Sequence, residues 1–123
     1  AELEGGSSTT GASTPGRQHF HPSALKACVR FHSAGSIAGS YNITSITDTA
    51  VGNWTVVIAT DFSGTTYYAS VTCGMPGANA GLMMNTATIA AGTCQVLAHD
   101  IANSLTDPTT EDTIFAGFAG DQA

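Results

Sequence analysis

The chain has 123 residues, the size of one domain, and a chain of this length can bury a core without metal or disulfide support. Lys, Arg, Asp and Glu together make up 10% of it, against roughly 25% in an ordinary soluble domain. The formal net charge is −6 and no cluster of Lys or Arg occurs, which excludes nucleic acid and membrane surfaces as partners. Half of the residues are Ala, Thr, Gly or Ser, a composition that favours strands over long amphipathic helices.

The sequence shows neither a signal peptide nor a spanning helix, so we expect a protein that is made in the cytoplasm or whose signal has been removed. Its three cysteines, Cys28, Cys73 and Cys94, are odd in number and widely spaced. This pattern predicts free thiols rather than a disulfide scaffold or a zinc knuckle.

The first residues are poor in core-forming side chains. Residues 5–16 are Gly, Ser, Thr, Ala and Pro, with no large apolar side chain among them. We predict that residues 1–19 form an extended, flexible N-terminal arm, because such a composition cannot bury enough apolar surface to order alone. Residues 20–123 are then the folded domain.

Short runs typical of strands follow the arm, separated by turn residues and without a sustained helical period. The alternation breaks near Ser45, which predicts a bulge, and Gly52 and Gly92 indicate a hairpin turn and an interruption. Loops are expected at residues 76–85 and 103–112. We predict six strands at residues 26–32, 37–48, 54–62, 65–75, 89–101 and 113–120.

Six strands at this spacing, without helices between them, predict an all-β fold, an antiparallel β-sandwich or jelly-roll-like domain. The inward side chains follow from the alternation of each run. They are Ala27, Val29 and Phe31; Trp54, Val56 and Ile58; Tyr67, Ala69, Val71 and Cys73; and Ile114, Ala116 and Phe118.

Several strands are also apolar on their opposite face, where Val57, Leu97 and Phe115 lie. A sandwich that stands alone shows polar residues there. Two explanations remain open: the alternation is assigned in the wrong phase, or the second face packs against another subunit.

The patterns that would indicate an enzyme are missing from the sequence. It has no G-x-S-x-G nucleophile motif and no G-x-x-x-x-G-K phosphate loop. Adjacent carboxylates occur only at Glu111 and Asp112, beside a turn, where a solvated loop is the simpler interpretation. We therefore expect no catalytic residues and no cofactor.

Four histidines allow a metal hypothesis. His19 and His21 flank Phe20, and three chains meeting on an axis there would offer six imidazole nitrogens to one ion. The competing interpretation is an arm that docks through Phe20. His32 and His99 are expected at the surface or in an interface.

Three aromatic residues raise the question of a sugar-binding platform. Trp54, Tyr67 and Tyr68 would be cross-strand neighbours in a hairpin. Trp54 and Tyr67 fall on inward faces and are predicted to be core residues, and only Tyr68 is expected to be exposed.

Two segments carry a family resemblance, which extends over nearly all of the chain after the arm. Residues 20–31 hold Phe-His-Pro-Ser, Lys-Ala and Phe31, and residues 40–56 read Ser-Tyr-Asn-Ile-Thr-Ser-Ile-Thr-Asp followed by Gly-Asn-Trp-Thr-Val. This order resembles a domain of tailed-phage and prophage virion proteins of the tail-fibre type. The chain departs from the pattern at Cys28, where relatives have Trp, and at residues 30–33, where they have a polar Asn-Phe-Asn-Gly turn.

The resemblance implies an all-β, non-enzymatic domain on the virion surface, assembled in the host cytoplasm and homotrimeric. We expect a capsid decoration or short head-fibre protein that contacts other virion proteins, the major capsid or fibre protein, through its arm. The alternative is the receptor-binding tip of a tail fibre, which would bind a host surface glycan.

Overall fold

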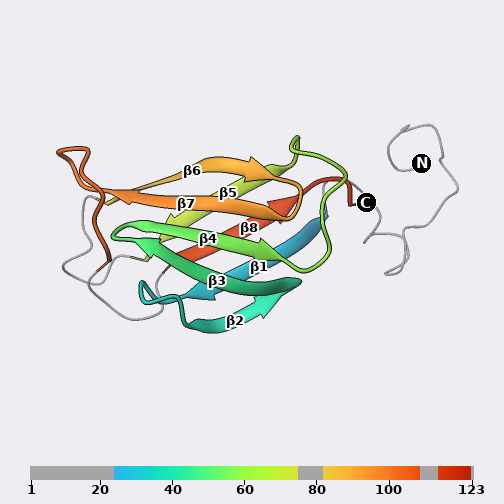
Figure 1. Cartoon of the computed structure of the whole chain (residues 1–123), viewed down its shortest axis with the longest axis horizontal. Helices are drawn as coiled ribbons and strands as arrows, with labels where there is room; N and C mark the ends of the chain where they lie inside the picture. Colours follow the sequence, from blue (N-terminus) through green and yellow to red (C-terminus); the bar gives the residue numbers. More distant parts are fainter. Residues whose placement is uncertain (1–23, 75–81, 109–113, 123) are drawn as a thin grey trace, which may run out of the picture.

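The chain folds as two four-stranded antiparallel sheets packed face to face, shown by a computed structural model that describes residues 24–74, 82–108 and 114–122 (Figure 1). This arrangement confirms the predicted β-sandwich. Sheet A has the strand order β2-β1-β8-β5, and sheet B has the order β3-β4-β7-β6. The strands are β1 Leu25–Phe31, β2 Ile37–Tyr41, β3 Ile43–Ala50, β4 Asn53–Ile58, β5 Tyr68–Cys73, β6 Met83–Ala90, β7 Thr93–His99 and β8 Ile114–Ala119.

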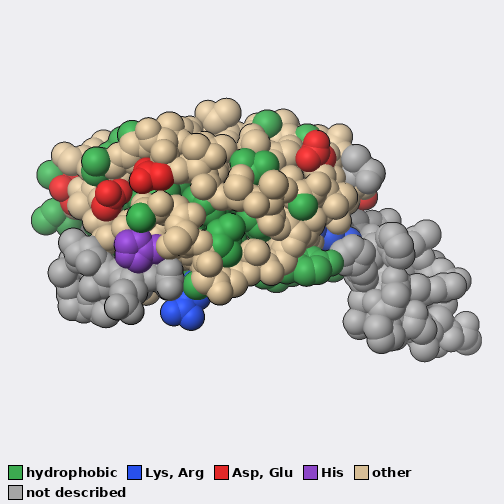
Figure 2. Space-filling model, turned by 60° about the horizontal axis from the view of Figure 1, so that its bottom comes forward, with side chains coloured by type: hydrophobic (Ala, Val, Ile, Leu, Met, Phe, Trp, Pro, Cys, Tyr) green, Lys and Arg blue, Asp and Glu red, His purple; other side chains and the backbone are tan. Residues whose placement is uncertain are grey.

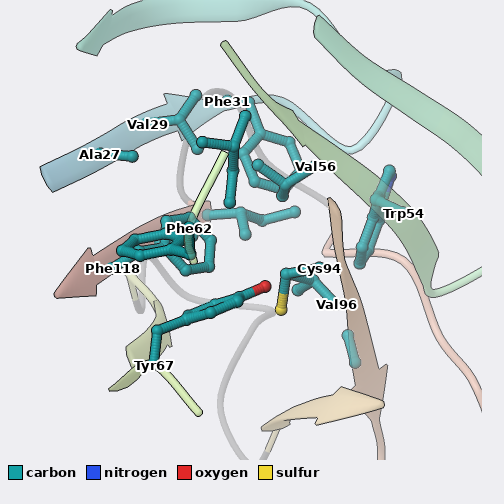
Figure 3. Close-up of a cluster of buried hydrophobic side chains, with 14 residues drawn as sticks. Ala27, Val29, Phe31, Trp54, Val56, Phe62, Tyr67, Cys94, Val96 and Phe118 are labelled. Carbon is teal, nitrogen blue, oxygen red and sulfur yellow. The ribbon is translucent and has the colours of Figure 1, made fainter. Parts of the chain in front are cut away.

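The core lies between the sheets and is made from their inner faces (Figure 3). Trp54, on β4, is completely buried, contacts Phe31 edge to face at a ring distance of 5.9 Å, and donates its indole N–H to the carbonyl oxygen of Ser33 at 2.6 Å. The inward sets predicted for β1, β4 and β8 are all buried. Because Tyr67 is buried as well, both aromatic residues expected in the core are found there.

The predicted second strand, residues 37–48, is in fact two strands in different sheets. β2 pairs with β1 in sheet A, and β3 pairs with β4 in sheet B. The chain crosses between the sheets at Asn42, whose φ is 56°, a backbone conformation open to Asn but rare for other side chains. The predicted bulge near Ser45 is present, as a register shift between Ile43 and Ser45.

The predicted fifth strand, residues 89–101, is also two strands. β6 and β7 form a hairpin whose turn is Ala91 and Gly92, so the expected interruption at Gly92 is a complete reversal of the chain. β6 begins at Met83, inside the segment predicted to be a loop. Eight strands therefore stand in the described part of the chain where six were predicted.

The hairpin between β3 and β4 turns at Gly52, as predicted. Gly52 is buried and has a φ of 63°. Its N–H donates to Oδ1 of Asp107 at 2.6 Å, and a Cβ there would lie 2.6 Å from the backbone nitrogen of Thr106. The turn is thus packed beneath the segment that follows β7.

Candidate functional site

The outer faces of both sheets carry apolar side chains, as the sequence indicated. Burial alternates along β4, β7 and β8, with Val57, Leu97 and Phe115 at outward positions. The predicted phase is therefore correct, and the explanation that the alternation was misassigned is wrong. Apolar side chains do lie on the outside of this chain.

The outer face of sheet A is hollowed into a groove of about 500 Å³. Antiparallel pairing sets the groove side chains in two rows across the sheet. The Cys28 row consists of Tyr41, Cys28, Gly117 and Ser70, and the Arg30 row consists of Gly39, Arg30, Phe115 and Thr72, in the strand order β2, β1, β8, β5.

The glycines form the hollow and the aromatic residues form its walls. A Cβ placed on Gly39 would meet no atom within 4 Å. Phe115 is 42% exposed and Tyr41 51%, large fractions for side chains of this size. Tyr68, predicted to be exposed, is 67% exposed at the β5 edge of the same face.

Among the residues that the structure describes, Arg30 is the one charged residue that lines the groove. Its guanidinium carbon lies 5.6 Å from the centre of the Phe115 ring, within the range of a cation–π contact. This contact holds the guanidinium of Arg30 against the Phe115 ring at the wall of the groove.

The outer face of sheet B differs in chemistry. Its side chains are mostly uncharged and bond to one another: the Gln95 amide donates to Oδ1 of Asn53 at 2.9 Å, and the hydroxyls of Thr49 and Thr55 are 3.4 Å apart. Figure 2 shows few charged side chains on the visible surface, with several of the acidic ones near its left end. The outer face of sheet B thus combines Val57 and Leu97 with hydrogen-bonded polar side chains, whereas the groove described above lies on sheet A.

The histidine hypothesis is untested at its main position, because His19, Phe20 and His21 lie outside the described residues. His32 accepts a hydrogen bond from the backbone N–H of Ala34 at 2.9 Å, and His99 lies 3.3 Å from the amide of Asn85. Both are partly exposed, as expected. Within the described ranges no group of three His, Cys, Asp or Glu side chains could hold a metal ion.

Tyr67 and Cys94 form the most perturbed titratable pair, and it lies inside the core. The Tyr67 hydroxyl points towards Cys94 (Figure 3). It shares its hydrogen bond between two backbone acceptors, the carbonyl oxygens of Ala90 at 2.9 Å and of Thr93 at 3.0 Å. Burial raises the pKa of the Cys94 thiol to about 11, and burial together with Cys94 raises the pKa of the Tyr67 hydroxyl. Both groups stay protonated and serve packing.

Some sequence expectations fail on geometry. Trp54 belongs to sheet B and Tyr68 to sheet A, so the predicted cross-strand cluster with Tyr67 does not form. Glu111 and Asp112 lie outside the described residues. The groove was missed because Gly39 and Gly117 come from strands far apart in sequence, although the outward position of Phe115 was a signal for part of it.

Comparison of the chain with protein-family models, curated proteins and solved structures finds no match. In the described ranges, no helix has the length and apolar character that crossing a membrane requires. The three cysteines are free thiols.

Proposed function

We propose that the chain is a non-enzymatic structural protein of a tailed-phage virion surface, a capsid decoration or short head-fibre protein. The sequence resemblance to tail-fibre-type domains is the reason for proposing a tailed-phage particle. The observation that supports a structural role is the outer face of sheet A, where Leu25, Tyr41, Tyr68 and Phe115 are each more than 40% exposed. A clustered apolar surface of this kind is characteristic of proteins that pack against other proteins.

Attachment to the particle is assigned in this proposal to the N-terminal arm. The arm is rich in Gly, Ser and Thr, and an extended chain of about 20 residues reaches roughly 60 Å. Backbone hydrogen bonds to neighbouring proteins, with Phe20 as an apolar anchor, would offset the entropy of ordering it.

The test removes residues 1–18 and mixes the shortened protein with particles that lack the native one. We expect the shortened protein to keep its circular dichroism spectrum and to lose particle binding. A matched control replaces residues 1–18 by a Gly-Ser segment of equal length, which keeps the backbone donors and acceptors as well as Phe20 and should restore binding. Undiminished binding by the shortened protein would move attachment to the β-domain, and absence of the protein from purified particles would refute the virion role.

A receptor-binding fibre tip is the second candidate, and the exposed Tyr68 and Tyr41 favour it because aromatic rings at a surface can stack on sugars. It predicts binding of the purified protein to host cells, lost in Tyr68→Ser and Tyr41→Ser. Cell binding that survives both substitutions, or none by the wild type, would count against this candidate.

A further inference from the structure

The two rows of the groove show a regular pattern of side-chain size. In every strand of sheet A, the two groove residues whose side chains face outward are two positions apart, one in each row, and one is larger than the other. The pairs, larger member first, are Tyr41 and Gly39 in β2, Arg30 and Cys28 in β1, Phe115 and Gly117 in β8, and Thr72 and Ser70 in β5.

This pattern is complementary to itself. A second copy can be placed so that its sheet A faces sheet A of the first copy. The two copies are then related by a two-fold axis that runs midway between these two facing sheets, perpendicular to their strands, and passes between the two rows. The rotation exchanges the rows and leaves each strand above its own counterpart. Tyr41 then faces Gly39 of the second copy, Phe115 faces Gly117, and Arg30 faces Cys28.

We propose that the outer face of sheet A is a self-association surface, and that its occupant is a second copy of this chain packed through this two-fold axis. An isologous contact requires one patch to supply both the protruding and the receiving elements. Gly39 supplies an open receiving element, since a Cβ there would meet nothing within 4 Å. At Gly117 the end of the Leu25 side chain, with Cδ1 3.3 Å from the position of a Cβ, has to move aside to receive Phe115 of the second copy.

The charge of Arg30 favours this axis over an axis parallel to the strands. An axis parallel to the strands and running along β1 would also set aromatic residues over glycines, but it would place Arg30 opposite Arg30. Two cations on a shared apolar face repel each other. The perpendicular axis places each Arg30 opposite a Cys28 thiol, so the two Arg30 side chains do not face each other.

The area of the outer face of sheet A sets the expected strength of the dimer. Strands lie about 4.8 Å apart and rise about 3.4 Å per residue, so four strands of about six residues present a face of roughly 20 by 20 Å. Interfaces of this area belong to the small, weak class. We expect a dimer that dissociates at micromolar concentrations and that gains strength where copies are held close together.

The first experiment fills the hollow. Gly39→Gln adds bulk where Tyr41 of the second copy would pack, at a site that is open within one chain, without a second cation beside its cross-strand partner Arg30. The matched control is Gly64→Gln, which makes the same change where a Cβ would also meet nothing within 4 Å, outside the groove. In sedimentation from low to high micromolar concentration, the wild type and Gly64→Gln should dimerise and Gly39→Gln should stay monomeric.

The second experiment tests the axis. Cys28→Asp places a carboxylate opposite Arg30 of the second copy, so the dimer should tighten several-fold at low salt and lose that gain at high salt. With the axis along β1, the same substitution would set two carboxylates against each other and weaken the dimer. Unchanged or weakened association would overturn the proposed geometry, provided that the variant keeps the wild-type circular dichroism.

The alkylation rates of the native thiols can show where the two copies are in contact. Cys28 lines the groove, whereas Cys73 does not. As the protein concentration rises through the dimerisation range, alkylation of Cys28 should slow at least several-fold while that of Cys73 stays constant, as measured by mass spectrometry.

Several results would overturn the proposal. They are a monomer at all concentrations, a trimer, association with Cys28 fully reactive, or protection of Cys28 only when a glycan or another virion protein is added. Because these measurements use the purified protein without particles, their failure is distinct from failure of the virion role.

Discussion

Trp54 shows how one residue joins packing to hydrogen bonding. It is fully buried, and its indole N–H is bonded to Ser33, so the residue contributes both apolar burial and a satisfied polar group. Trp54→Ala should lower the free energy of unfolding by about 3 to 5 kcal/mol, as large-to-small core changes do. Urea denaturation followed by circular dichroism measures it. Wild-type stability with lost cell binding would instead assign Trp54 to a ligand site.

Gly52 is required for a different reason, because both its backbone conformation and its surroundings exclude a side chain. Its φ is 63°, and a Cβ would lie 2.7 Å from the carbonyl oxygen of Ala98. Gly52→Ala should cost about 3 kcal/mol or more, from left-handed strain plus displaced backbone. Gly64→Ala, in open space, is the control and should change thermal unfolding little. Equal midpoints for the two variants would contradict this account.

Stability should fall at high pH through Cys94. Its folded pKa of about 11 exceeds the ordinary value of 9.0, so the unfolded chain loses the proton first as the pH rises. The stabilising contribution is complete below pH 9 and is lost between 9 and 11, at about 1.4 kcal/mol per pH unit. Tyr67 adds a loss of the same sign above its ordinary 10.0.

Denaturation at a series of pH values measures this slope. Cys94→Val, which removes the thiol, should unfold with a shallower dependence on pH across the same interval. An identical slope in the variant would show that other groups cause the loss.

At the scale of elements, Asn42 is the corner between the two sheets. Its side-chain amide donates to the carbonyl oxygen of Lys26 at 3.0 Å, and its Oδ1 accepts from the N–H of Thr60 at 3.0 Å. One residue thus ties β1, the β2–β3 crossover and the segment after β4 together, which explains why a run that reads as one strand is divided here.

The corner predicts an order of stability. Asn42→Gly keeps the left-handed backbone but loses two hydrogen bonds, each worth about 1 kcal/mol. Asn42→Ala loses the same bonds and adds roughly 1 to 2 kcal/mol of backbone strain. Chemical denaturation should therefore rank wild type above Asn42→Gly and Asn42→Ala last. A reversed order of the two variants would contradict the role of the backbone.

The sequence predicted elements well where alternation and turn chemistry agreed. Ala27, Val29 and Phe31 alternate without a break, and β1 is found one residue from its predicted start. Residues 37–48 were predicted as one strand because the residues on both sides of the corner are typical of strands. The crossing from sheet A to sheet B is visible only in the left-handed backbone conformation of Asn42. The groove could not be predicted, since its two rows depend on the register between β1, β2 and β8.

At the scale of the whole molecule, the sheets differ in how far apart their central strands lie in sequence. β4 and β7 form the centre of sheet B, whereas β1 and β8, close to opposite ends of the described chain, form the centre of sheet A (Figure 1). Sheet A also takes three of its buried residues, Ile114, Ala116 and Phe118, from β8. Its stability thus depends on the last strand.

Truncation tests this dependence. A chain ending at residue 108 lacks β8, which separates β5 from β1 and opens the core, so we expect it to be unfolded by circular dichroism and heteronuclear NMR. A chain ending at residue 120 keeps all eight strands and should remain folded. A folded protein without β8 would mean that sheet B is stable alone.

The pairing of β1 with β8 also orders events during synthesis. β1 and β2 leave the ribosome before β8, and the groove needs Phe115 and Gly117 of β8 beside β1, more than 80 positions after Arg30 and Cys28. Pairing over so long a separation is slow, because loop closure precedes any contact. Neighbouring nascent chains on one messenger RNA therefore lack the face through which folded copies would associate until β8 has been synthesised and paired.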